Sequence, residues 1–123
     1  TLLLVAERLK TILQSTHAEQ LPFQFLVSHL ASMIKDQQIR PYLILWLELT
    51  ASAAGGEEYY RTIARQIGDS FFDWIASALE VEHEEDRKAL AALAFATVEG
   101  FVLLDALGSD SLITNALEGL AVR

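Results

Sequence analysis

The chain has 123 residues, of which 52% are apolar, and it carries a formal net charge of -8 and no cysteine. This length fits one domain with a core of its own, so we expect residues 1–123 to form a single unit. The negative charge argues against direct nucleic-acid binding, because phosphates would be repelled, and the absence of cysteine excludes disulfides, thiolate metal sites and thiol catalysis.

Apolar residues recur at helical spacing through the first half of the chain. The pattern predicts a first helix over 2–14, which starts so close to Thr1 that further residues are expected before it. The opening lacks the basic leader of a signal peptide. Helices are also predicted over 22–35 and 41–54, each with a proline in its first turn, where a missing N–H costs nothing.

The second half of the chain begins with a glycine pair. Gly55 and Gly56 predict a left-handed helix end, and the acidic residues after them favour the start of a helix over 57–81. Aromatic and aliphatic residues recur there at intervals of three and four, and Gly68 indicates either a close helix crossing or a bend. A fifth helix is predicted over 84–108.

The last predicted helix is short. Gly108 ends the fifth helix, and Ser109 or Ser111 can cap a final helix that runs to Leu117. The chain contains no alternating strand pattern and no internal repeat. We therefore expect an all-α fold, an antiparallel bundle of about six helices.

The segment 84–108 is apolar around most of its circumference, whereas an ordinary surface helix has a single apolar stripe. One stripe holds Leu90, Leu93, Thr97, Phe101 and Leu104, and another holds Ala92, Phe95, Ala96, Glu99, Leu103 and Ala106. Such a helix has to be covered from two sides, so we expect one cover from its own domain and the other from a second copy. A membrane span is the alternative, and Glu99 and Asp105 argue against it because carboxylates are costly inside a bilayer.

Two stretches, joined by the long aromatic helix, carry a family resemblance. They are 40–56, which opens with Arg-Pro-Tyr-Leu, and 96–108, which reads ATVEGFVLLDALG. Together they resemble the C-terminal regulatory domain of TetR-like (tetracycline-repressor-like) transcriptional regulators. The resemblance extends over the whole chain, with 2–14 matching the helix that connects the DNA-binding unit of that family to its effector domain.

The resemblance implies a cytoplasmic homodimer that pairs its last two helices, here 84–108 and 109–120, into a four-helix bundle. It also implies a small apolar or amphipathic effector in a cavity bounded by the preceding helices. Effector binding would shift the first helix and thereby control DNA binding. DNA would be bound only through an N-terminal helix-turn-helix domain that is not present in this chain. The short last helix departs from the commoner family pattern, so the fourth helix is expected to share in the dimer contact.

The predicted sites follow from the apolar faces of these helices. Bulky faces on the third, fourth and fifth helices can leave a gap between them, which is the usual form of a small-molecule site. The predicted ligand-binding residues are Leu26, His29, Met33, Tyr42, Trp46, Leu49, Ile63, Ile67, Phe71, Thr97 and Phe101. The predicted dimer-interface residues are Ala92, Phe95, Ala96, Glu99, Leu103, Ala106, Leu112 and Ala116. His29 is a polar anchor of the pocket in this interpretation; the plainer one is a half-buried histidine bonded to a backbone carbonyl.

No catalytic residue, metal site or cofactor is predicted. The three histidines lie far apart in sequence without a paired ligand spacing. Glu99 and Asp105 lie six positions apart and do not face each other on a helix, so they do not form an acid–base pair. We expect Glu99 at the dimer seam, bonded to Thr97 or to the partner copy, and Asp105 in solvent or at the cap of the next helix.

Two further classes of function remain open from the sequence. The first is a helical-bundle interaction module that binds another protein, or itself, without any small-molecule ligand. The second is a small helical enzyme, which is the weakest because no converging acid, base and nucleophile can be named.

Overall fold

The computed structural model describes residues 4, 7, 8, 11 and 19–122. The four separate residues are helical, and the rest of the predicted helix over 2–14 lies outside the described residues. The elements that follow are α2 (Phe23–Met33), α3 (Arg40–Ala54), α4 (Glu58–Ala78), the short 3-10 helix η1 (Glu84–Asp86), α5 (Arg87–Ala106) and α6 (Asp110–Ala121). This part of the chain contains no named strand, which confirms the all-α expectation for it.

Both prolines lie at helix starts, as predicted. Pro41 occupies the first turn of α3, and Pro22 stands one position before α2, where its carbonyl accepts the first helical bond from Leu26. The fourth helix ends at Ala78, earlier than expected, because Leu79 turns into an extended conformation. This turn lets the chain after α4 form backbone hydrogen bonds with Leu21, which precedes α2.

One arginine joins the end of α4 to the start of α5. The guanidinium of Arg87 donates to the carbonyls of Ala76 and Leu79 at 2.6 and 2.7 Å, so it satisfies acceptors that the helix end leaves without a partner. It also holds the Glu84 carboxylate in two hydrogen bonds of 2.7 and 2.9 Å. This pair lowers the pKa of Glu84 through the hydrogen bond with Arg87.

Glycine supplies two of the turns, as predicted. Gly56 and Gly108 have φ values of 97° and 75°, the left-handed region that L-residues avoid. At Gly68 an added methyl group would lie 3.8 Å from the Phe95 ring and 3.9 Å from Trp46, which is ordinary contact, so no close helix crossing requires a glycine there. The last helix is longer than predicted, and Ser109 precedes it without a capping bond from its side chain.

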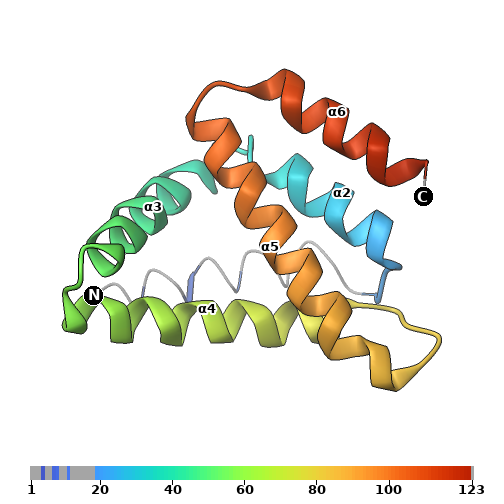
Figure 1. Ribbon diagram of the computed structural model, residues 1–123, viewed down its shortest axis with the longest axis horizontal. Helices are drawn as coiled ribbons and strands as arrows, with labels where there is room; N and C mark the ends of the chain where they lie inside the picture. Colours follow the sequence, from blue (N-terminus) through green and yellow to red (C-terminus); the bar gives the residue numbers. More distant parts are fainter. Residues whose placement is uncertain (1–3, 5–6, 9–10, 12–18, 123) are drawn as a thin grey trace.

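Helix α5 is central to the described part of the chain. It contacts α2, α4 and α6, while α3 packs against α4. Figure 1 shows α5 running diagonally across α2 and α4, with α3 and α4 diverging from the glycine turn between them. Ala91 and Ala94 are fully buried, so the small side chains of α5 let its neighbours approach closely. The main core lies where α2, α4 and α5 meet.

Candidate functional site

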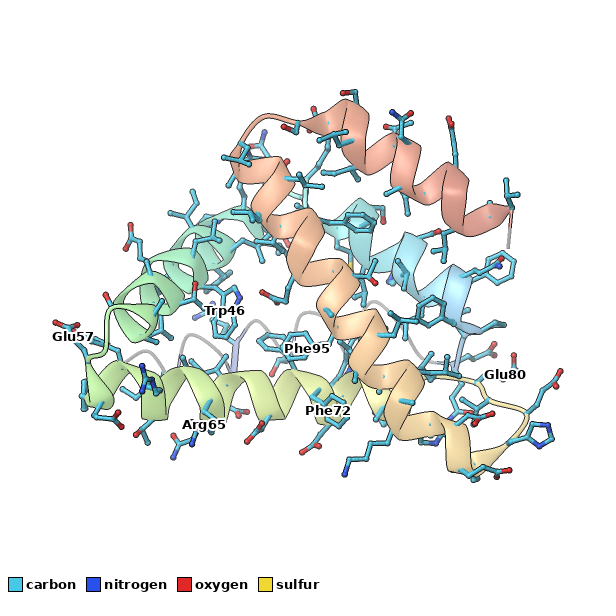
Figure 2. The ribbon with its side chains drawn as sticks, in the orientation of Figure 1. Trp46, Glu57, Arg65, Phe72, Glu80 and Phe95 are labelled. Atoms are coloured by element: carbon cyan, nitrogen blue, oxygen red, sulfur yellow. The ribbon has the colours of Figure 1, made fainter. Side chains whose placement is uncertain are left out.

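A cavity of about 100 Å³ lies where α2, α3, α4 and α5 diverge. Its wall on α3 and α4 includes Tyr42, Trp46, Leu49, Ile67, Phe71 and Trp74, and its wall on α5 includes Phe95, Val98, Glu99 and Val102. Figure 2 shows Trp46 and Phe95 pointing into the space between their helices, whereas Arg65 points away from it. The cavity is therefore apolar and rich in aromatic rings.

The cavity owes its position to the arrangement of the helices. The turn at Gly55 and Gly56 folds α3 back onto α4, and Leu49 packs there against Ile63 and Ile67. Helix α5 crosses the other half of α4, where it joins the main core. The three helices therefore separate between these two packed regions, and the large side chains only partly fill the space.

Among the described residues, Glu99 is the only charged one in the cavity wall. Its Oε2 accepts a hydrogen bond of 2.7 Å from the indole Nε1 of Trp46, which lies 53 positions away in the sequence. Burial raises the pKa of the Glu99 carboxyl above its ordinary value, and the hydrogen bond from Trp46 offsets part of that rise. The position of this carboxylate differs from the prediction that it lies at the dimer seam beside Thr97.

The structure brings together part of the predicted ligand-binding set. Met33, Tyr42, Trp46, Leu49, Ile67 and Phe71 line the cavity. Leu26, His29, Ile63, Thr97 and Phe101 do not line it. Leu26 and Phe101 are buried in the main core, and Ile63 is buried in the cluster that it forms with Leu49 and Ile67. The hydroxyl of Thr97 donates to the carbonyl of Leu93 at 2.7 Å. His29 is half-buried on α2 and is not among the residues of the cavity wall.

The predicted ligand-binding set contains none of the α5 residues that line the cavity. Phe95, Val98, Glu99 and Val102 recur at intervals of three and four, so they form one stripe that faces the cavity. The spacing was visible in the sequence. Nearly every other stripe on α5 is equally apolar, however, so spacing alone did not distinguish this one.

Asp105 also has a partner on α3. Its Oδ2 lies 3.4 Å from Nη1 of Arg40, and its side chain is only 12% exposed. The expectation of a carboxylate in solvent or at a helix cap is therefore wrong. Both acidic residues of α5 therefore bond to side chains of α3, Glu99 to Trp46 and Asp105 to Arg40.

The opposite side of α5 is exposed and carries no charge. We define the outer stripe as Ala89, Leu93, Ala96, Gly100, Leu103 and Leu107, which are all exposed and recur at intervals of four and three. Of the predicted interface residues, Ala92, Ala96, Leu103, Ala106, Leu112 and Ala116 are exposed on α5 and α6. Phe95 and Glu99 are a correction to that set, because they line the cavity on the other side of α5.

By length and composition, the segment Glu84–Ala106 could cross a membrane, and it is the one such helix in the described part of the chain. A core helix of a helical bundle passes the same test. Glu99 and Asp105 both lie in this segment. Each carboxylate contacts a side chain of α3, which is Trp46 for Glu99 and Arg40 for Asp105.

The described residues contain no group of three or more His, Asp or Glu side chains placed to hold a metal ion. No protein-family model, curated protein or solved structure matches this chain.

Proposed function

We propose that this chain is the ligand-sensing and dimerisation domain of a TetR-like transcriptional regulator, with a bundle of about six helices. In this proposal a small apolar or amphipathic effector occupies the cavity, and two copies pair through α5 and α6. DNA binding belongs to a separate N-terminal domain, and the protein works in the cytoplasm. The sequence resemblance described above supports the regulator class. The cavity supports effector binding, and the outer stripe supports dimerisation.

One observation carries the proposal: helix α5 contributes residues both to the cavity wall and to the outer stripe. Val98, Glu99 and Val102 of α5 line the cavity, while Ala96, Gly100 and Leu103 lie on the outer stripe. A ligand that shifts or rotates α5 therefore changes the surface that a second copy would meet. Such coupling between two sites typically amounts to about 1 to 3 kcal/mol.

The outer stripe has the features of a helix-pairing seam. Its intervals of four and three residues repeat as they do along a coiled coil. The small residues Ala96 and Gly100 near its middle allow two backbones to approach closely, and Leu93 and Leu103 flank them with exposed apolar area. Because the stripe is free of charge, a second identical stripe can pack on it without burying an unpaired ion.

A second candidate, an interaction module without a ligand, is favoured by the size of the cavity. At about 100 Å³ it is smaller than the roughly 300 to 1,000 Å³ of typical ligand pockets. In this case the same α5–α6 face would bind a protein partner, and the cavity would be a packing defect.

Thermal unfolding in the presence of compact apolar compounds separates the two candidates. A compound that binds only the folded chain stabilises it by about 2.7 kcal/mol at a hundred times its Kd, so we expect the melting temperature to rise by several degrees. Val98→Phe, which places a ring in the cavity, should abolish the rise. The matched variant Ile44→Phe, at an exposed position of α3, should retain it.

Two results would contradict the ligand proposal. One is a set of compounds that never shifts the melting temperature of the wild-type chain. The other is an equal shift in the Val98→Phe variant, which would place binding outside the cavity. Circular dichroism of both variants confirms that they fold before the comparison is made.

A further inference from the structure

The charge of the cavity wall is unusual for an apolar site. In the part of the chain that the structure describes, every residue that lines the cavity besides Glu99 is uncharged, and none of them is a lysine or arginine. The nearby cation Arg40 is paired with Asp105. Glu99 therefore brings a negative charge to an apolar space without an ion-pair partner among the described residues.

The Glu99 carboxylate has acceptor sites that a ligand could use. An ionised carboxylate has two oxygens with about four acceptor sites. The described residues supply one hydrogen bond, from Trp46 to Oε2, and none to Oε1. A carboxylate held in this way is costly unless a further donor or a positive charge reaches it.

Aromatic rings surround the same space. Tyr42, Trp46, Phe71 and Phe95 line the cavity from three helices. The faces of such rings attract organic cations, with the strongest attraction at tryptophan and in desolvated sites. An anion would meet repulsion from Glu99, and a neutral apolar molecule would leave its charge unpaired.

The volume limits the size of the group that enters. A cavity of about 150 Å³ lined by apolar residues holds benzene, so about 100 Å³ admits only a compact group. Tyr42 and Leu45 of the same wall are only partly buried, so we expect a longer ligand to extend outward on their side.

We infer that the cavity binds the head of a small organic cation, a methylated ammonium or a protonated amine on a short apolar group, with Glu99 as its counter-ion. The rings of Trp46 and Phe95 contact the apolar and methyl surface of the head. This inference rests on the proposed ligand-sensing function, because it names the charge and size of the ligand that the same cavity takes.

Two compounds of nearly identical shape test the inference. Phenyltrimethylammonium and tert-butylbenzene differ in the replacement of the charged nitrogen by carbon. Binding is followed by tryptophan fluorescence, because both tryptophans of the chain line the cavity, and by calorimetry. We expect the wild-type chain to bind the cation roughly tenfold more tightly than the neutral compound, or better.

Glu99→Gln separates the charge from the shape of the cavity. The amide oxygen can still accept from Trp46, so the variant should fold and should lose most of its preference for the cation. Glu48→Gln is the matched control, because it removes the same charge from an exposed position on α3 and should keep the full preference.

The outcomes distinguish this inference from the proposal on which it rests. Equal binding of the two compounds by the wild-type chain, or an unchanged preference in Glu99→Gln, would show that Glu99 does not select a cation. Either result would still agree with a ligand-binding cavity. If neither compound changes the fluorescence or the melting temperature of the wild-type chain, both the cation and the ligand-sensing proposal fail.

Discussion

Glu99 shows how a single side chain depends on its tertiary surroundings. Its neighbours in the sequence are apolar, and the residue that bonds it, Trp46, belongs to another helix. Burial raises the pKa of its carboxyl, while the hydrogen bond from Trp46 opposes the rise. The folded chain therefore holds a proton on Glu99 more readily than the unfolded chain does.

The pH dependence of stability follows from this direction. When the folded pKa lies above the unfolded one, the stabilising contribution of the group is complete below its ordinary value of 4.5 and is lost as pH rises through the folded pKa. Glu99→Gln, which stays neutral, should exceed the wild type in stability near neutral pH by on the order of 1 kcal/mol. The difference should shrink as pH falls towards 4.5.

Urea unfolding of both proteins across this range measures the difference. Glu48→Gln serves as the control, because an exposed carboxylate should show no comparable change. If Glu99→Gln were less stable than the wild type at neutral pH, the folded state would favour the ionised carboxylate, and the assigned direction of the pKa shift would be wrong.

Among the helices, α5 has two apolar sides, of which one faces the other helices and one is exposed. The side with Phe95 and Val102 is covered by α2, α3 and α4 or lines the cavity. The outer stripe is exposed, with Leu93 and Leu103 each 53% accessible. An exposed apolar stripe of this length on a helix is a typical site of association.

Leu103→Lys tests whether the outer stripe mediates self-association. We expect the wild-type chain to sediment as a dimer at micromolar concentration. A lysine within a pairing seam buries a charge without a partner, and should weaken the dimer by about 2 kcal/mol or more. Sedimentation equilibrium measures the change in the dissociation constant.

Ile44→Lys provides the matched control for this variant. Ile44 is 54% exposed and lies on α3, outside the outer stripe, so the same charge change there should leave the dimer intact. A monomeric wild type, or equal weakening by the two substitutions, would show that the outer stripe does not mediate self-association.

At the scale of the whole molecule, the net charge of -8 opposes association. Two copies together would carry twice this charge, while the outer stripe itself contributes none. Salt screens charges that are separated by more than about 10 Å at 0.1 M. Dimerisation should therefore tighten as sodium chloride is raised, since screening removes repulsion and leaves apolar packing intact.

Sedimentation at low and high salt provides the measurement. A dissociation constant that falls with added salt agrees with an apolar interface between two acidic molecules. A dissociation constant that rises with salt would indicate that ion pairs hold the copies together, contrary to the assignment of the outer stripe.

Local chemistry in the sequence determined the helices and many of their ends. Pro41 and the left-handed glycines Gly56 and Gly108 act through their own backbone preferences, which need no distant partner. The apolar residues that recur at intervals of three and four along α4 include the buried Ile63, Ile67 and Trp74. These features were predictable because each depends on residues a few positions apart.

The tertiary structure alone decided which side of α5 faces the cavity and which is exposed. A helix that is apolar around most of its circumference has no contrast from which its orientation could be read, so Phe95 and Glu99 were placed on the outer side. The pairing of Glu99 with Trp46, and of Asp105 with Arg40, likewise required the fold to bring α3 within side-chain reach of α5. Side-chain partners far apart in sequence meet only after helices pack, and no local pattern encodes that meeting.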